Sequence, residues 1–201
     1  MTEGYIKFNC IRTTEENSLS EEKYRQLEEA RVQLYHLGLI GIYPNGIGFG
    51  NISIREDAKK SFFISGSATG GKETLEPSDY ALVTDYSIAQ NIIFCSGIID
   101  ASSESLTHAA IYQSVPEAGA VIHVHNLWLW QVLLNQLPTT SLTIEYGTPE
   151  MALSVGELAS QLNNIEEKII VMGGHREGIL CFGQDLKQAT QQIITVYEQC
   201  Y

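Results

Sequence analysis

The residues with the clearest chemical potential are two histidines in the run Val121-Ile-His123-Val-His125. Side chains alternate between the two faces of a β-strand, so this spacing puts both imidazoles on one face and Ile122 and Val124 on the other. Two imidazoles about 7 Å apart along one strand face can bind one divalent metal ion. The alternative is a pair of half-buried histidines that hydrogen-bond to neighbouring groups.

A third histidine follows a glycine pair. His175 comes directly after Gly173-Gly174, at the end of an apolar, strand-like stretch. A tight connection of this kind at a sheet edge can direct a third ligand towards a metal ion. A solvated turn histidine is the alternative when His175 is considered alone.

Two hydroxyls and a carboxylate open an expected helix at Ser102-Ser103-Glu104. Hydroxyls and early backbone amides at a helix N-terminus bind anions readily. Plain capping, with Glu104 favouring the helix dipole, is the alternative. His108 lies four residues after Glu104 on the same helix face, and we expect it to be a packed, hydrogen-bonded partner and not a ligand.

Two glycine-rich runs resemble nucleotide-binding loops without their essential features. Gly66-Ser-Ala-Thr-Gly-Gly71-Lys72 has most of the P-loop spacing, yet Glu73 stands where a Ser or Thr would hold magnesium. Pro77 falls where the following helix would continue. Gly46-Ile-Gly48-Phe-Gly50 precedes a strand-like stretch, whereas a dinucleotide loop opens a helix. We therefore expect the first run to be a turn between strands that can still bind a phosphate.

The elements that position these residues alternate between strands and helices. Ser20 is a candidate N-cap of a helix that ends near Gly38. Further helices are expected over 102–114, 127–137 and 184–199 and from Pro149 onward, with strands over 51–55, 61–65, 80–84, 92–95, 119–125, 168–172 and 178–182. This interleaving alone favours a parallel sheet with helices on both faces.

Length, composition and charge restrict the class of protein. The chain has 201 residues, 44% of them hydrophobic and 18% charged, and a formal net charge of −12. We expect a single domain over 1–201, with residues 1–18 as an N-terminal tail. No Lys/Arg cluster offsets the acidic charge, so nucleic acid and anionic membrane surfaces are not expected partners. The longest apolar run, 127–134, is far shorter than the ~20 residues of a membrane span.

The four cysteines point to a reducing compartment. Cys10, Cys95, Cys181 and Cys200 form no C-x-x-C pair, and Cys95 and Cys181 lie in apolar, strand-like stretches. We expect buried free thiols and a cytoplasmic location.

Taken in order, these pieces resemble the class II aldolase/adducin family, typified by L-fuculose-phosphate aldolase. The resemblance extends from about residue 27 to about residue 196. Each piece is short, and the ordered set is specific. The matching runs are Gly50-Asn51-Ile-Ser-Ile-Arg55, Ile64-Ser-Gly-Ser67-Ala68, Ser102-Ser103-Glu104 with His108, His123-Val-His125-Asn126, Tyr146-Gly147-Thr148, and Gly174-His175 with Gly178.

The resemblance implies a fold and a metal site. The family fold is a three-layer α/β/α sandwich with a largely antiparallel central sheet. The family ligand set implies one divalent metal per chain, usually Zn²⁺, bound by His123, His125 and His175. Glu104 would lie beside the metal, as a further ligand in the resting site or as the catalytic base. Family members are often homotetramers with active sites at subunit interfaces.

The resemblance also implies a substrate class. Hydroxyls and backbone amides hold a substrate phosphate in the family, and the matching positions are Asn51, Ser67, Ser102 and Ser103. Such a pocket needs little basic charge, so it is compatible with the net charge of −12. The implied activity is a metal-dependent aldolase-type lyase that cleaves a small phosphorylated sugar through a metal-stabilised enediolate.

The chain departs from the aldolase pattern in the stretch after His125. The aldolase has a proton-donating tyrosine there, whereas Leu142 and Thr143 occupy that area here. Dehydration or epimerisation of a sugar phosphate, by enzymes with the same ligand set, is therefore an alternative within the family. A non-catalytic adducin-like assembly module is an alternative of a different class. Such a module is expected to have lost ligands, and this chain keeps the three histidines and Glu104.

Overall fold

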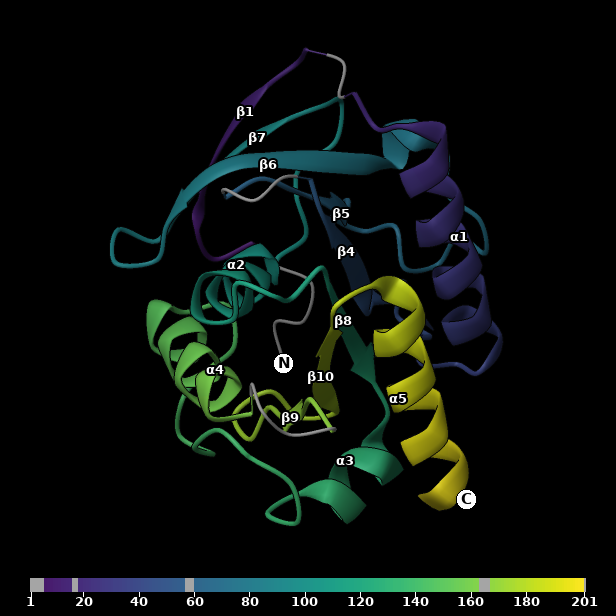
Figure 1. The fold of residues 1–201 in the computed structure, drawn as a ribbon, viewed down its shortest axis with the longest axis vertical. Coiled ribbons are helices and arrows are strands. Elements are labelled where there is room, and N and C mark those ends of the chain that lie inside the picture. Colours follow the sequence, from purple (N-terminus) through teal and green to yellow (C-terminus); the bar gives the residue numbers. More distant parts are fainter. Residues whose placement is uncertain (1–5, 16–17, 57–59, 163–166, 201) are drawn as a thin grey trace.

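The computed structural model describes residues 6–15, 18–56, 60–162 and 167–200. Within them the chain forms five α-helices, a short 3-10 helix and ten strands (Figure 1). The helices are α1 (Glu21–His36), α2 (Ser105–Ser114), α3 (Leu127–Leu133), α4 (Pro149–Gln161) and α5 (Leu186–Cys200), and the 3-10 helix is Pro77–Asp79. The strands are β1 (Asn9–Thr13), β2 (Gly41–Ile42), β3 (Gly48–Phe49), β4 (Asn51–Arg55), β5 (Phe62–Ser65), β6 (Tyr80–Ser87), β7 (Ile92–Ser96), β8 (Ala120–His125), β9 (Ile169–Val171) and β10 (Gly178–Gly183).

Eight of these strands form one mixed sheet in the order β1-β7-β6-β5-β4-β8-β10-β9. Only the β1–β7 pair is parallel, and every other neighbouring pair is antiparallel. The parallel sheet favoured by interleaving alone is therefore wrong, and the largely antiparallel sheet of the family is confirmed. The physical reason is the connectivity: β4 to β7 follow one another as antiparallel neighbours without an intervening α-helix, so they need no crossover helices.

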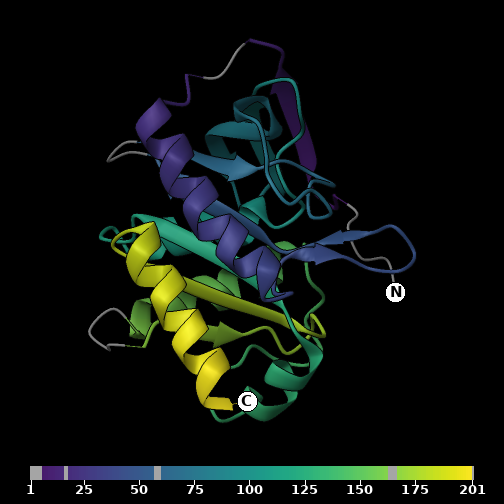
Figure 2. The same cartoon turned by 90° about the vertical axis from the view of Figure 1, so that its right-hand side faces the viewer.

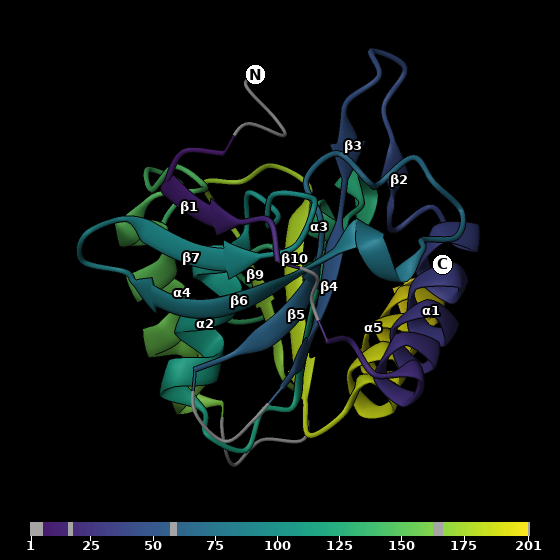
Figure 3. The same ribbon diagram turned by 90° about the horizontal axis from the view of Figure 1, so that it is seen from above.

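Helices cover both faces of the sheet. Helices α2 and α4 lie on one face, and α1 and α5 lie side by side on the other (Figures 2 and 3). Each face has its own buried apolar cluster, so the protein is a three-layer α/β/α sandwich. Within each outer layer the two helices pack against each other, α2 against α4 and α1 against α5.

Helix α1 follows the expected pattern closely. The Ser20 hydroxyl accepts a hydrogen bond from the Lys23 amide at 3.4 Å, as expected of an N-cap. Leu27, Ala30 and Leu34 are buried against the sheet. The helix ends before Gly38, which has a φ of +68°.

Three elements differ from the expected ones. The expected tail contains β1, which pairs with β7 through the register Asn9–Ile92 to Thr13–Ser96. Segment 41–50, for which no strand is expected, contains the β2–β3 hairpin, which projects from the body of the molecule (Figures 2 and 3). Helix α3 is only 7 residues long and ends at Leu133. In the described part of the chain, no helix is long and apolar enough to cross a membrane.

Candidate metal centre and pocket

His123 and His125 lie on one face of β8, as their spacing predicts. Ile122 and Val124 point to the opposite face, into the apolar cluster beneath α1 and α5. Both imidazoles are buried, and their Nε2 atoms lie 2.8 Å apart. Tetrahedral Zn²⁺ with Zn–N distances of 2.0–2.1 Å would place two nitrogens about 3.3 Å apart, so a small opening of this pair would admit the ion.

His175 completes the cluster from a turn after β9. Its ring centroid lies 5.0 Å from that of His123 and 4.7 Å from that of His125. One ligand atom from each of the three residues lies within 4.8 Å of the other two. The glycines before His175 permit this placement, because a Cβ on Gly174 would lie 1.7 Å from the Ile144 carbonyl oxygen.

Hydrogen bonds behind the rings leave the Nε2 atoms available for a metal. His123 Nδ1 lies 3.3 Å from the Ile179 carbonyl oxygen, to which it can only donate. His125 Nδ1 lies 2.9 Å from the hydroxyl of Tyr43. Metal-bound histidines in proteins usually donate their other ring N–H in this way, so the arrangement fits a metal centre.

The charge state of the imidazoles also suits metal binding. Burial lowers the pKa of His123 and of His125 well below the usual value, and the neighbouring imidazoles lower both further. The rings are therefore neutral near pH 7, as metal coordination requires.

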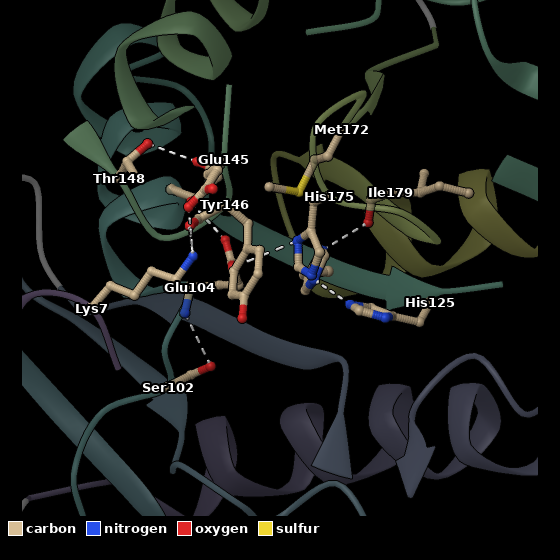
Figure 4. A network of polar contacts seen from close by, with 12 residues as sticks. Lys7, Ser102, Glu104, His125, Glu145, Tyr146, Thr148, Met172, His175 and Ile179 are labelled. Carbon is tan, nitrogen blue, oxygen red and sulfur yellow. Dashed lines mark hydrogen bonds and ion pairs between the residues drawn. The ribbon is translucent and has the colours of Figure 1, made fainter. Parts of the chain in front are cut away.

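Glu104 lies beside the cluster at the start of α2. Its carboxylate is buried, accepts a hydrogen bond from Thr107 Oγ1 at 2.7 Å, and lies 3.7 Å from His175 Nδ1. Figure 4 shows Glu104 and Tyr146 on one side of His175 and His125 on the other. The helix begins at Ser105, so Ser102 and Ser103 form the turn before it and not its first residues.

A pocket of about 280 Å³ opens next to the cluster. Its walls include both histidines of β8 but not His175. The walls also contain Glu104 and every residue expected to hold phosphate, namely Asn51, Ser67, Ser102 and Ser103. Asn51 Oδ1 is buried and has no hydrogen-bond partner among the described residues, so this acceptor is available to a hydroxyl of a ligand.

Two contacts bring the serines of the pocket together. Gly66 forms an isolated antiparallel bridge with Ala101, which places the turn at Ser67 beside the turn at Ser102. Arg31 of α1, buried at 1% exposure, donates to the carbonyls of Thr69 and Glu73 and thereby fixes the glycine-rich run.

The glycine-rich run lacks the helix that follows a P-loop. No α-helix follows it among the described residues; the chain continues into the 3-10 helix Pro77–Asp79. The ammonium of Lys72 pairs with Asp79 at 2.7 Å instead of facing the pocket.

The two remaining histidines lie outside the cluster. His36 forms an exposed pair with Glu73. His108 is fully buried, and its Nδ1 lies 2.8 Å from Ser53 Oγ, as expected of a packed, hydrogen-bonded residue. Burial lowers its pKa to about 3.

Tyrosines from two other segments contact the cluster. The ring of Tyr146 stacks on His175 with centroids 4.3 Å apart, and the ammonium of Lys7 lies 3.8 Å from the centroid of the Tyr146 ring. Tyr43 reaches His125 from the β2–β3 hairpin. Tyr146 belongs to the run Tyr146-Gly147-Thr148 of the family resemblance, whereas sequence reasoning missed Tyr43, which nothing in the local pattern marks.

The fold and the buried three-histidine cluster agree with the family comparison. The class II aldolase and adducin N-terminal domain matches residues 33–201, and the chain belongs to this family. No curated protein sequence matches the chain.

Solved structures with this fold include several aldolases. An L-fuculose 1-phosphate aldolase is 20% identical, with 90% of this chain and 84% of that chain covered and a TM-score of 0.65. The L-fuculose-1-phosphate aldolase from Thermus thermophilus is 24% identical, with 88% and 90% covered and a TM-score of 0.63. A sugar-phosphate aldolase from Thermotoga maritima is 17% identical, with 89% and 92% covered and a TM-score of 0.66. At these identities the likeness is one of fold.

Proposed function

We propose that the protein is a metal-dependent aldolase-type lyase that acts on a small phosphorylated sugar. The observation that carries the proposal is one pocket that joins two kinds of group. Histidines of the buried cluster and the carboxylate of Glu104 line it beside the uncharged donors Asn51, Ser67, Ser102 and Ser103. The similar folds of an L-fuculose 1-phosphate aldolase and a sugar-phosphate aldolase support the substrate class.

The three histidines would hold one divalent ion per chain, for which we propose Zn²⁺. Three neutral nitrogen ligands with an adjacent carboxylate and open space beside them are typical of a catalytic zinc site. When bound, such an ion polarises a substrate carbonyl and makes the neighbouring C–H more acidic.

Glu104 would move the proton at the reacting carbon. Its carboxylate is buried beside His175 and lines the pocket, so it can reach a substrate bound there. Thr107 donates a hydrogen bond to one carboxylate oxygen, Oε2, and this contact orients the carboxylate. A positioned base of this kind accelerates proton transfer by about 10²- to 10⁴-fold.

The uncharged donors would bind the substrate phosphate. Asn51 follows Gly50, whose φ of +75° lets the chain turn into β4 at the wall of the pocket. Backbone amides and hydroxyls in turns bind phosphate without a basic side chain. An acidic protein can therefore hold a phosphorylated sugar at this site.

Cleavage also needs a group that takes up the proton of the substrate hydroxyl as this hydroxyl becomes the aldehyde, and that returns the proton in the reverse reaction. Tyr112 is buried and hydrogen-bonded to Ser53. Tyr197 packs against the apolar cluster beneath α1 and α5, on the face of the sheet opposite the histidines. Tyr201 lies outside the described residues. Tyr146, which stacks on His175, is our candidate for this group.

Dehydration or epimerisation of a sugar phosphate is the second candidate function. The absence of a tyrosine from the sequence between His125 and Glu145 favours it, because the aldolase pattern has its proton donor there. The retained histidine cluster and Glu104 argue against a non-catalytic adducin-like module. A homotetramer and a cytoplasmic location remain predictions.

Solvent-deuterium exchange separates these functions. Proton removal beside the carbonyl of dihydroxyacetone phosphate needs only the metal and Glu104, so we expect metal-dependent exchange that is lost in Glu104→Gln. Cleavage of L-fuculose 1-phosphate also needs the group that takes the proton of the hydroxyl that becomes the aldehyde, and we expect cleavage to be slower than exchange. Fast cleavage would show that this group is present in full. Exchange that is absent from the metal-loaded protein would exclude the lyase.

A further inference from the structure

The β2–β3 hairpin contributes two side chains to the environment of His125. The ring of Phe49 stacks on the imidazole with centroids 5.6 Å apart and an interplanar angle of 29°. Tyr43 packs against Phe49 at 4.5 Å between centroids, and its hydroxyl reaches His125 Nδ1 at 2.9 Å. The hairpin therefore contacts His125 on one ring face and at Nδ1.

The hydrogen bonds of Tyr43 form a directed chain. Its hydroxyl donates to Glu177 Oε2 at 2.7 Å. A hydroxyl has one proton, so the contact with His125 must be one in which Nδ1–H donates to the tyrosine oxygen. This direction puts the proton of neutral His125 on Nδ1 and leaves the lone pair of Nε2 facing His123 and His175.

Glu177 occupies a backbone conformation that an ordinary turn would give to glycine. Its φ is +79°, in the left-handed region, where a side chain with a Cβ is strained. It lies in the short connection between His175 and Gly178, and its carbonyl accepts a hydrogen bond from the Asn126 amide at 3.0 Å. A strained backbone of this kind persists only where the surrounding structure holds the residue in place, and such residues are common at functional sites.

We propose that Tyr43 and Glu177 are positioning residues that fix the ring orientation and tautomer of His125 for metal binding. The inference rests on the proposed metal site. Carboxylate-to-histidine hydrogen bonds behind metal ligands orient the ring and raise the basicity of the ligand nitrogen. Here a tyrosine from a separate hairpin transmits that contact, so three segments of the chain meet at one imidazole.

The test compares metal affinity in hydroxyl and carboxylate variants of the full-length protein. Competition with a chromophoric chelator gives the affinities for Zn²⁺ and Co²⁺. We expect Tyr43→Phe, which keeps the ring packed on Phe49, to weaken binding by about 10- to 100-fold. Glu177→Gln should weaken it less, because the amide oxygen can still accept from Tyr43.

Matched controls separate positioning from general disturbance. Tyr24→Phe removes a tyrosine hydrogen bond to the Leu75 carbonyl away from the site, and Glu73→Gln removes the carboxylate beside His36. Both should bind metal as the wild type does. Wild-type affinity in Tyr43→Phe would overturn the proposal.

Glu177→Gly provides the sharpest contrast. Glycine adopts a positive φ without strain, so the midpoint of thermal unfolding of the metal-free protein should stay unchanged or rise while the metal affinity falls. A purely structural turn would leave the affinity unchanged. Equal metal affinity in this variant and the wild type would therefore contradict the role of the carboxylate.

Nitrogen NMR of the metal-free protein tests the tautomer without a metal. We expect His125 to carry its proton on Nδ1 in the wild type and to gain the Nε2–H form in Tyr43→Phe. Identical tautomer populations would overturn the proposal. A wild-type protein that bound no metal would contradict the proposed function, and the tautomer measurement would then decide the positioning role by itself.

Discussion

The two faces of β8 are equally buried and differ in chemistry towards the end of the strand. Towards α1 and α5 the strand presents Ala120, Ile122 and Val124, which are at most 1% exposed. Towards the other face it presents Val121 and then His123 and His125, which are at most 3% exposed. One strand thus supplies an ordinary apolar core on one side and the candidate metal centre on the other.

The difference shows that a buried polar face needs partners from elsewhere in the chain. An apolar side chain is stabilised by burial alone, whereas a buried imidazole loses its hydration and needs a hydrogen bond in exchange. His123 finds the Ile179 carbonyl on β10, and His125 finds Tyr43 on the β2–β3 hairpin. The polar face therefore depends on several segments, and the apolar face mainly on the strand's own pattern.

The largest effect is expected from alanine substitutions of residues on the two faces of β8. His123→Ala or His125→Ala should abolish stoichiometric binding of one metal per chain, because three protein ligands leave none to spare. Ile122→Ala should keep the metal and lower the free energy of unfolding by about 2–5 kcal/mol, because it leaves a cavity. Metal analysis of the purified proteins and urea unfolding measure the two effects.

The contrast between the two faces of β8 is wrong if loss of metal and loss of stability do not occur in different variants. Stoichiometric metal in either histidine variant would refute the ligand assignment. A loss of metal in folded Ile122→Ala would show that the apolar face also positions the ligands.

Glu104→Gln should give the second largest effect. Glutamine keeps the shape of the side chain but cannot accept a proton, so the rate of exchange or cleavage should fall by about 10²- to 10⁴-fold while most of the metal is retained. The control is Glu150→Gln, in the first turn of α4, where the glutamate is exposed. Wild-type rates in Glu104→Gln would show that Glu104 is not the base and serves only at the start of the helix.

The apolar pattern made much of the fold predictable. Alternation in β8 correctly separated His123 from Ile122. The N-cap Ser20 and the first-turn proline Pro149 correctly marked the starts of α1 and α4. These features depend on residues close together in the sequence. The antiparallel order of the sheet came from the family resemblance, because interleaving alone indicated the wrong sheet type.

Long-range contacts limited the rest of the prediction. The strand β1 is recognisable only through its pairing with β7, about 80 residues away. Tyr43 and Arg31 likewise act through contacts with His125 and with the glycine-rich run, which no local pattern announces. The residues that cluster at the candidate site were therefore easier to name from the sequence than the groups that contact them.

Removing one hydroxyl from the pocket should give a smaller effect. A hydrogen bond to a charged group contributes about 1.5–3 kcal/mol, so Ser67→Ala or Ser102→Ala should weaken the preference for a phosphorylated over an unphosphorylated ketose by about 10- to 100-fold. Ser160→Ala, on the exposed side of α4, is the control. A preference that does not change in either pocket variant would argue against phosphate at this end of the pocket.

The smallest effect concerns pH and extends the comparison to His108, which meets the polar face of the sheet through Ser53. Burial lowers its pKa to about 3 in the folded protein, whereas an unfolded histidine has a pKa of about 6.5. Between these values the unfolded chain binds the extra proton, so the free energy of unfolding falls as the pH falls, by about 1.4 kcal/mol per unit for this residue. Above about pH 7 both states are neutral and the contribution is flat. Urea unfolding of the metal-free protein at pH 7, 6 and 5 should show a shallower slope in His108→Gln and the wild-type slope in His36→Gln, whose ring is exposed beside Glu73. An unchanged slope in His108→Gln would mean that His108 takes up its proton without unfolding.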